Sequence, residues 1–526
     1  MSVLRSITLF AIQALTFASF VHGAAPVIAA RPGIKPEAFR ITTFATNLFF
    51  PYGMARLPDN SLLVGTSRPR TDSDGYFASR GELLRLTDAN GDGVADAPPQ
   101  RLVVQSLPHG EDQPGTNIAL PGILVDVRVV DRLVVVVSAE FGNEQILFLQ
   151  LGAGPDFPLT LLGHLRLAFP WVHHQTYGLL VRPSPSPAGP GRYDVVFNVG
   201  ALYNRQLHMI RIPISGLATL EAHDASLYRM TVTLDASTSS ISVSELRQIA
   251  QGVRNAAGLA FDPGSGELWF ADNGIDPAPE VIKSADELNF LRLSEAAAVP
   301  PHFGYPDEFV ELDSGITNGL SSVQPVMVFR EVEGDGESEG PAQMTWAPPQ
   351  FPAGLNLGVF IGFHGDYDQW GAENRENAVV YADPATGQFL HFLRPNQPDV
   401  GHLDGLLATE DSLFLADLTG TNSLNTYHAG GVIYQIKHIG TPVDCGSLPP
   451  ARLEAAIEPN GSSLRLSWDA RLADCIVESS SLGPVVRWTR LTGTPLSDGE
   501  RHWVTVPFGT QPRFFRLRCP ECVPGP

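Results

Sequence analysis

A pattern that occurs six times along the chain limits what it can fold into. Each copy has a small or apolar opening, a hydrophobic run, a turn and a second hydrophobic run. The clearest copy extends from Gly258 through Asp262-Pro263 to Phe270. Two apolar runs joined by a turn are typical of adjacent antiparallel strands. The copies open at Tyr52, Gly122, Gly178, Gly258, Gln343 and Gly405.

Further strand-like segments lie between the copies, at residues 82–86, 146–151, 207–212, 378–381 and 432–436. Together with each copy they give up to about four strands per unit, which is typical of a propeller blade. The spacing of roughly 55–85 residues between copies predicts long insertions in some blades. We expect the segment 40–47 to pair with the last blade and close the ring. A large β-sandwich is the alternative, but it does not explain six copies of one pattern.

The fold class predicted is therefore all-β: a six-bladed β-propeller over residues 36–440, followed by a small C-terminal β-sandwich over residues 447–522. The 50 Gly and 44 Pro residues agree with many short strands joined by tight turns. The linker between the two parts is expected at 440–442. Short strands of the sandwich are expected at 452–457, 464–468, 475–478, 487–491, 503–506 and 513–517. This part has no evident catalytic group of residues and is interpreted as an accessory or sorting module.

All four cysteines lie in the C-terminal part, at Cys445, Cys475, Cys519 and Cys522. In an exported chain they predict two disulfides, with three possible connectivities. A zinc site is the alternative, although no His lies near these cysteines at a finger-like spacing.

The N-terminus has the pattern of a signal peptide, residues 1–23. Arg5 precedes an apolar run from Ile7 to Val21, and small residues follow at Gly23 and Ala24. The run is short for a membrane span, and no later stretch supplies a transmembrane segment. The mature protein is expected to be secreted or periplasmic; a core helix is the alternative for this run.

The net charge of −21, from 35 basic and 56 acidic residues, excludes a basic surface that follows a phosphate backbone. Nucleic acid and an anionic membrane surface are therefore not expected as partners.

The most specific motif begins at Gly252 with GVRNAAGLAFDPGSGELWFADNGID and continues with DELNFL from Asp286. An aromatic-Gly-aromatic-Pro turn follows at residues 303–306. This segment resembles the glucose/sorbosone dehydrogenase family, propellers that use pyrroloquinoline quinone (PQQ) and calcium. The blade copies extend the resemblance over residues 40–437.

The resemblance implies roles for six residues of this segment. Arg254 and Asn255 match a pair that contacts the quinone, and a guanidinium suits a polyanionic cofactor. The carbonyls of Gly274 and Ile275 match positions that bind the cofactor's calcium. A second, structural calcium would be held by Asp286 and Glu287, since carboxylates suit that ion. A structural salt bridge is the alternative role for Arg254.

A histidine pair, His173-His174, opens the third blade. In the resembling enzymes a His at this place is the general base that removes a sugar hydroxyl proton, which suits the pKa of imidazole. The resemblance places that role on His174, with His173 where an Asp commonly orients the base. A polar histidine at the rim is the alternative.

The run from Phe363 to Asp366 resembles a family motif in the fifth blade. It suggests His364 and Asp366 as substrate-contacting or supporting residues. The family places a cation farther along this blade and another in the sixth. Here these places are Ala378 and residues 401–403, which contain no Lys or Arg, although His402 is a partial substitute.

An acidic loop resembles the first nine positions of an EF-hand, with oxygen ligands at alternate positions and a glycine at the turn. Pro99 stands where an EF-hand has its bidentate Glu. We expect a structural calcium site, with a plain acidic turn as the alternative. The proposed ligands are Asp88, Asn90, Asp92, Val94 and Asp96.

The function that the resemblance implies is an exported PQQ- and calcium-dependent oxidoreductase of a sugar or polyol. Its partners would be a small carbohydrate and an electron acceptor. The missing cations favour a second hypothesis, a non-enzymatic propeller that binds carbohydrate or protein. A propeller hydrolase that uses calcium and His174 is the third.

Overall fold

The structure is a computed structural model. It describes residues 25–30, 34–72, 74–105, 120–140, 142–154, 156–170, 174–185, 189–206, 208–276, 284–293, 299–330, 340–367, 369–374 and 379–440. In the C-terminal part it describes 443–444, 452–459, 461–472, 475–481, 489–491, 495–508, 513–518 and 522–523. The expected signal peptide, residues 1–23, lies outside the described residues.

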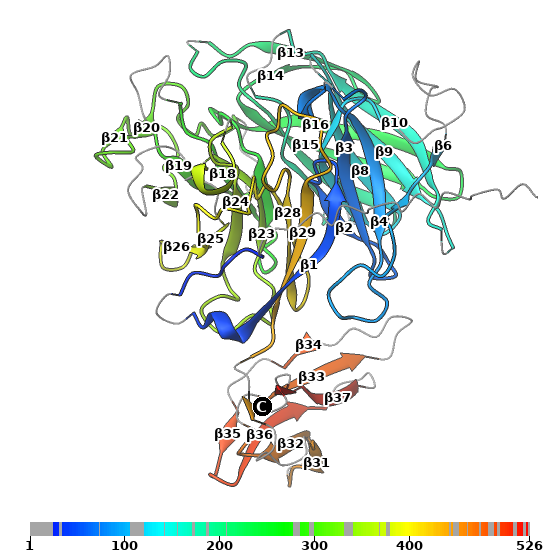
Figure 1. Cartoon of the computed structure of the whole chain (residues 1–526), viewed down its shortest axis with the longest axis vertical. Coiled ribbons are helices and arrows are strands. Elements are labelled where there is room, and N and C mark those ends of the chain that lie inside the picture. Colours follow the sequence, from blue (N-terminus) through cyan, green and yellow to red (C-terminus); the bar gives the residue numbers. More distant parts are fainter. Residues whose placement is uncertain are drawn as a thin grey trace, which may run out of the picture.

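Six antiparallel sheets form the blades, which are named here in chain order, with strands running from the inner to the outer edge (Figure 1). They are blade 1, β2 (Met54–Arg56), β3 (Leu62–Arg68), β4 (Arg80–Leu86), β5 (Gln100–Arg101); blade 2, β7 (Ile123–Val130), β8 (Leu133–Glu140), β9 (Asn143–Leu151), β10 (Leu159–Leu167); blade 3, β11 (Leu179–Pro183), β12 (Arg192–Val199), β15 (Ser226–Asp235), β16 (Ser240–Gln251); blade 4, β17 (Gly258–Phe261), β18 (Leu268–Asp272), β19 (Asp286–Leu291), β22 (Met327–Phe329); blade 5, β23 (Pro341–Trp346), β24 (Val359–Phe363), β25 (Val379–Asp383), β26 (Gln388–Leu393); and blade 6, β27 (Gly405–Ala408), β28 (Ser412–Asp417), β29 (Gly431–His438), β1 (Phe39–Leu48).

The inner strands make a closed ring, because each contacts the next and β27 returns to β2. The small opening residue of the repeat allows this close approach. A Cβ on Gly258 would lie 2.5 Å from the carbonyl oxygen of Ala342, and one on Gly405 would lie 2.1 Å from that of Tyr52. The predicted six-bladed propeller is confirmed, and the opening glycines Gly178, Gly258 and Gly405 are explained by packing between blades.

The ring is closed by the N-terminal strand. β1 pairs antiparallel with β29, with Phe39 opposite His438 and Leu48 opposite Gly431. Phe44 of β1 packs edge-on against Phe414 of β28, with ring centroids 5.2 Å apart. The expected pairing of residues 40–47 with the last blade is confirmed, and Figure 1 shows β1 running beside β29.

Blade 2 is wider than predicted. β13 (Arg211–Gly216) and β14 (Leu220–His223) extend it outward from β10, and the short β6 (Val104–Gln105) pairs parallel with the other end of β10. The strand expected at 207–212 is therefore corrected to 211–216. Exposed and buried side chains alternate over Arg211, Ile212, Pro213 and Ile214. This alternation, and not the apolar run before it, is the pattern that corresponds to the strand.

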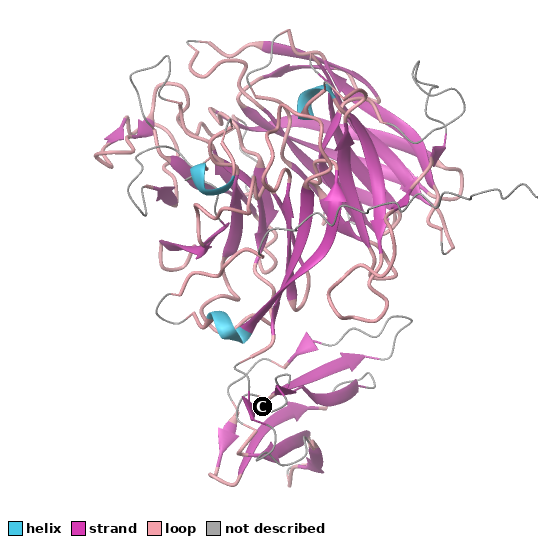
Figure 2. Ribbon diagram, viewed as in Figure 1, coloured by secondary structure: helices cyan, strands magenta, loops and turns pink. Residues whose placement is uncertain are grey.

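The remaining short elements lie in connections. A two-stranded ribbon, β20 (Phe309–Val310) and β21 (Thr317–Asn318), follows β19, and three short 3₁₀ turns occur at Pro36–Ala38, Tyr76–Ala78 and Gly371–Glu373. Figure 2 shows how strongly strands dominate the chain. Within the described part, no helix has the length and apolarity to cross a bilayer.

The C-terminal part forms two small sheets (Figure 1). One contains β31 (Glu454–Ile457), β32 (Ser463–Asp469), β36 (Arg501–Pro507) and β35 (Leu496–Ser497). The other contains β34 (Thr489–Arg490), β33 (Ile476–Ser481) and β37 (Arg513–Arg518). In addition, β30 (Val443–Asp444) pairs with β38 (Cys522–Val523). Trp468 and Val477, one from each sheet, are buried in a shared core, as expected for a small β-sandwich. Cys475 is disulfide-bonded, which supports a disulfide over zinc at this cysteine. The side chains of Cys445, Cys519 and Cys522 lie outside the described set.

Candidate functional site

One end of the propeller carries the predicted site residues that the structure describes, apart from those of the 88–96 loop. In an antiparallel blade, the entry to the inner strand and the connection between the second and third strands lie at the same end. His174, Arg254 and His402 lie at such entries, and Gly274 and His364 lie in such connections. We call this end the entry face. His173 lies outside the described residues.

Arg254 is almost completely buried and bonds to neighbouring protein groups. Its Nε donates to the carbonyl of Asn204 at 3.1 Å, and its Nη1 donates to Oδ1 of Asn273 at 2.7 Å. Its Nη2 donates to Oδ1 of Asn204 and to Oδ2 of Asp276, both at 2.7 Å. We call Arg254, Asn204, Asn273 and Asp276 the Arg254 cluster.

The carboxylate of Asp276 stands where a ligand's carboxylate would pair with the guanidinium. Its side chain is 44% exposed, whereas that of Arg254 is 2% exposed. Asp276 is held by Asn204, whose Oδ1 accepts from its backbone N–H and whose Nδ2 donates to its carbonyl. An anionic ligand would therefore have to displace Asp276.

Asn255 and the loop after β18 are arranged by buried carboxylates. Asp272 accepts from the backbone N–H groups of Arg254 and Asn255, at 2.9 and 2.6 Å. The backbone N–H of Gly274 donates to Oδ1 of Asp286, and that of Ile275 donates to Oγ of Ser284. Oδ1 of Asn255 is buried and has no partner among the described residues.

Arg254, Gly274, Ile275 and Glu287 surround one small cavity, so the structure does bring these predicted residues together. The cavity has a volume of about 20 Å³, enough for one water molecule or ion. A tricyclic quinone is far larger than this space.

Two carboxylates beside this cavity lie directly opposite each other, Asp272 on β18 and Glu287 on β19. Burial, followed by the charges of Asp272 and Asp286, raises the pKa of Glu287 to about 8. Burial raises the pKa of Asp272 to about 6. Like charges facing each other across a ladder are destabilising, so this pair favours either a proton or a cation. Within the described chain, however, no three His, Cys, Asp or Glu side chains form a metal-binding group.

A different pair has the geometry of a general base. Nδ1 of His364 lies 2.8 Å from Oδ2 of the buried Asp404, and the His364 side chain is 25% exposed. No hydrogen bond to its Nε2 is present among the described residues. His402 stacks on the imidazole, with ring centroids 4.1 Å apart, and donates from Nδ1 to the His364 carbonyl at 2.7 Å. Burial lowers the pKa of His402 well below its usual value, so this ring is neutral.

Tyrosines from other blades surround this pair. Burial raises the pKa values of Tyr52, Tyr76 and Tyr177, and the charge of Asp404 contributes in each case. Tyr367 stacks on the other side of His364, with centroids 6.3 Å apart. His364, His402, Asp404 and these tyrosines are called the His364 cluster. It joins blades 1, 3, 5 and 6.

Several buried polar atoms in and beside the His364 cluster have no hydrogen-bond partner in the described protein. They are Oη of Tyr76, Oε1 of Gln175, Nε2 of His402, Oδ1 of Asp404 and Oγ1 of Thr419. Buried polar groups are nearly always hydrogen-bonded in native proteins, so such a set indicates that water or a polar ligand supplies the missing bonds. Three of these atoms can only accept, so the set suits a ligand rich in hydroxyl donors.

His174 is placed differently from His364. Its backbone N–H donates to the carbonyl of Ala201 at 3.1 Å, and the Ala201 N–H donates to the carbonyl of Arg254. The structure thus brings the segments of His174 and Arg254 side by side. Nε2 of His174 is buried, whereas the His364 ring is partly open.

An exposed aromatic rim adjoins the His364 cluster. It consists of Phe77, Tyr367, Trp370 and Tyr427, each more than a third exposed. Phe77 lies 5.8 Å from Tyr367, measured between ring centroids, and the Tyr367 hydroxyl donates to Oδ1 of Asn425 at 3.2 Å. Asp366 begins the same loop, and its backbone N–H donates to Asn374.

The acidic loop at residues 88–96 joins β4 to β5 and therefore lies at the end opposite the entry face. Its side chains cap its own backbone: Oδ1 and Oδ2 of Asp88 accept from Gly91 and Gly93, Oδ1 of Asn90 accepts from Asp92, and Oδ1 of Asp92 accepts from Val94. Asp96 accepts from the N–H of Ala89. Calcium binding here stays a prediction.

Asp404, which orients His364, was not predicted as a site residue from the sequence. Its signal was present, because Asp404 immediately precedes Gly405, the opening residue of the sixth copy. The tyrosines Tyr52 and Tyr177 occupy or adjoin the same place in their own copies.

No family model matches the chain, and no curated protein matches it. Similar solved structures include the apo form of a soluble aldose sugar dehydrogenase from Escherichia coli, at 17% identity, covering 76% of this chain and 99% of that one with a TM-score of 0.46. A PQQ-bound aldose sugar dehydrogenase from Streptomyces coelicolor is 16% identical, with coverage of 76% and 98% and a TM-score of 0.45. The PQQ domain of a pyranose dehydrogenase from Coprinopsis cinerea is 16% identical, with coverage of 79% and 98% and a TM-score of 0.47.

Proposed function

We propose that the entry face binds a sugar or related polyol and that the protein, with a redox cofactor, oxidises it. The observation that carries this proposal is the His364–Asp404 pair, which lies among buried polar atoms that lack protein partners. Hydroxyl groups supply donors for such acceptors. The exposed aromatic rim beside the pair offers flat apolar faces for the C–H face of a sugar ring.

His364 is the proposed base. Donation from its Nδ1–H to Asp404 fixes the tautomer with a lone pair on Nε2, directed away from the carboxylate. Nε2 then accepts the proton of the substrate hydroxyl, and the buried carboxylate stabilises the resulting imidazolium. The hydride that leaves the same carbon requires an acceptor. The resemblance originally placed the base at His174, and that assignment remains the competing prediction.

The redox cofactor implied by the resemblance is PQQ, and the described residues do not fit it as they stand. PQQ has three carboxylates, whereas Arg254 is the cation offered by the predicted positions and it already pairs with Asp276. Ala378 lies outside the described residues, and 401–403 supply a neutral histidine. The space beside Arg254 holds about one water. We therefore assign no catalytic step to the quinone.

This observation favours a second candidate function, a non-enzymatic propeller that binds carbohydrate at the same face. Both candidates share the sugar-binding site and differ only in the redox step. We propose structural calcium at Asp286 and Glu287 and at the 88–96 loop for either candidate. We also propose removal of residues 1–23, export to the periplasm or cell exterior, and an accessory role for residues 447–522. The disulfide at Cys475 supports an oxidising compartment.

Two titrations of the calcium-loaded protein separate these candidates. The first uses PQQ, followed by tryptophan quenching, on the wild type and on Asp276→Asn, which removes the competing carboxylate. Saturable micromolar binding that tightens in Asp276→Asn supports the oxidoreductase. The second uses aldoses and short oligosaccharides in a calorimeter, with Tyr367→Ala as the site variant and Tyr203→Ala as an exposed control. Sugar binding without PQQ binding supports the second candidate, and failure of both titrations contradicts the site itself.

A further inference from the structure

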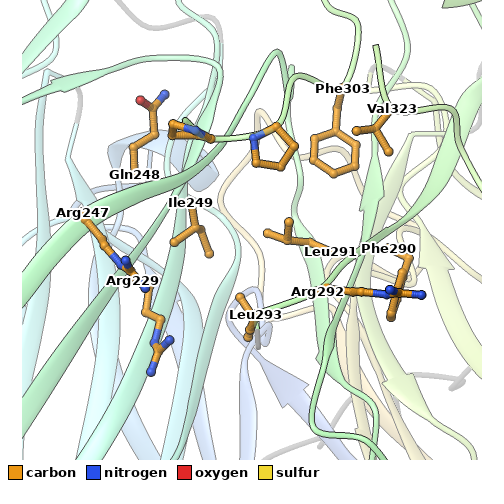
Figure 3. A pocket seen from close by; sticks show the side chains of 12 residues that line it. Arg229, Arg247, Gln248, Ile249, Phe290, Leu291, Arg292, Leu293, Phe303 and Val323 are labelled. Carbon is orange, nitrogen blue, oxygen red and sulfur yellow. The ribbon is translucent and has the colours of Figure 1, made fainter. Parts of the chain in front are cut away.

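A cavity lies on the flank of the propeller, between blades 3 and 4 (Figure 3). Blade 4 has a short outer strand: β22 pairs only with Asp286–Leu288 of β19. The rest of β19 has no outer partner strand among the described residues. The gap between this edge and β16 of blade 3 has a volume of about 650 Å³, which is within the usual range for small-molecule sites.

The cavity combines apolar walls with positive charge. Ile249, Leu291 and Phe303 belong to its apolar lining, and its charged lining residues are all arginines, Arg229, Arg247 and Arg292. No carboxylate is among the described lining residues. This excess of cations is notable in a chain with 35 basic and 56 acidic residues.

Arg229 and Arg247 stand directly opposite each other on β15 and β16. Arg229 pairs with the buried Asp194, at 2.9 Å, but shares this carboxylate with Arg182, so one negative charge serves two arginines. Arg247 is exposed and has no ion pair or hydrogen bond from its side chain in the described structure. Facing like charges are unfavourable, so an anion beside Arg247 would relieve a repulsion that the fold leaves in place.

We propose that this cavity binds a small amphiphilic carboxylate, with its head group on Arg247 and its apolar body against Ile249, Leu291 and Phe303. Figure 3 shows Arg229 and Arg247 on one side of the cavity and Arg292 on the other, with Ile249 and Leu291 between them. A guanidinium receives a carboxylate through two parallel hydrogen bonds, and the apolar walls reward a hydrocarbon or aromatic body. The cavity shares Phe303 with the small cavity beside Arg254, but its three arginines lie on the flank of blades 3 and 4, so the proposal does not depend on the proposed function.

The probe for this proposal is dodecanoate, titrated calorimetrically into the full-length protein below its micelle concentration. We expect saturable one-to-one binding. Arg247→Glu should weaken it by about tenfold or more, since one charge-assisted contact becomes repulsive. The control Arg211→Glu makes the same charge change at another exposed strand arginine and should change affinity less than about twofold.

A second variant and a second probe guard against indirect effects. Ile249→Glu places a carboxylate among the apolar walls and should also weaken dodecanoate by about tenfold, while circular dichroism verifies the fold. The neutral dodecan-1-ol should bind about tenfold more weakly than dodecanoate. Equal loss in Arg247→Glu and Arg211→Glu, equal binding of the alcohol, or no saturation at about 1 mM would each overturn the proposal.

Discussion

The Arg254 cluster and the His364 cluster lie on the same face of the propeller and differ in how fully their polar groups are satisfied. The Arg254 guanidinium bonds to Asn204, Asn273 and Asp276. In the His364 cluster, Nε2 of His402 and Oδ1 of Asp404 are buried without partners in the described protein. Because buried polar atoms require partners, the first cluster is complete as a structural unit, whereas water or a polar ligand completes the second. The motif that begins at Gly252 carried the strongest resemblance, and it therefore belongs to the more structural of the two clusters, the Arg254 cluster.

The variant His364→Gln gives the strongest test of this difference between the two clusters. We expect turnover with an electron-transfer dye to fall about 10²–10⁴-fold, the usual value of a general base, while stability changes by less than about 1 kcal/mol. Steady-state kinetics and thermal unfolding measure the two effects. His208→Gln, at an exposed histidine of the same face, is the control. Unchanged turnover in His364→Gln would return the base assignment to His174.

The converse variant is Arg254→Ala, which should act on stability first. It leaves Asn204 and Asn273 without their buried donor and Asp276 without its cation, at a cost of about 3 kcal/mol. Chemical denaturation measures this loss. Arg205→Ala, which removes a neighbouring and more exposed arginine, should cost under about 1 kcal/mol. If the two variants are equally stable, the Arg254 cluster is not the structural unit described above.

A third prediction uses Glu144, whose Oε2 accepts from the backbone N–H of Thr176 next to the His364 cluster. Burial raises the pKa of this carboxyl to about 8, against an ordinary value of 4.5. A raised pKa in the folded state gives stability that is complete below about pH 4.5 and is lost as the pH rises through 8. The wild type should lose of the order of 3 kcal/mol over this window relative to Glu144→Gln, which stays neutral.

Denaturation at pH 5 and at pH 8.5 checks this difference. Glu221→Gln, at an exposed strand position, should follow the wild type at both pH values. A wild type whose stability parallels Glu144→Gln across the window would show that Glu144 titrates normally and that the interior beside His364 is better hydrated than described.

The smallest effect is expected at the 88–96 loop. Calcium at about ten times its dissociation constant should stabilise the protein by about 1 kcal/mol, seen as a higher melting temperature that a chelator reverses. Asp88→Asn removes a charge and keeps only one of the two caps to the loop backbone, because the amide NH2 group cannot accept a hydrogen bond. It should reduce the shift. Asp262→Asn makes the same change in a turn capped in a similar way by Asp262 and should leave the shift intact. A shift that survives Asp88→Asn would place the calcium elsewhere.

The propeller was predictable because its evidence is local. Each copy of the repeat predicts two adjacent strands from its own residues. Glycines such as Gly258 and Gly405 lie where neighbouring blades contact each other. The width of blade 2 was not predictable, because β13 leaves its neighbours in the chain to pair with β10. No local pattern encodes that choice.

The site was only partly predictable for a related reason. Sequence motifs placed Arg254, His174 and His364 at one end of the strands, where the structure also has them. The motifs did not show that Asp276 forms an ion pair with the guanidinium of Arg254. Nor did they show that Asp404 of the sixth blade orients His364 of the fifth blade. These are contacts between side chains on different elements, and the spacing of residues along one chain does not report them.

The pairing of β1 with β29 also sets an order of events during synthesis. Phe39 meets His438 only after about 400 further residues have left the ribosome, so an incomplete chain has two unpaired strand edges. Exposed edges of this kind are templates for pairing between molecules. A nascent chain that stalls late in translation is therefore more prone to aggregate than the finished protein.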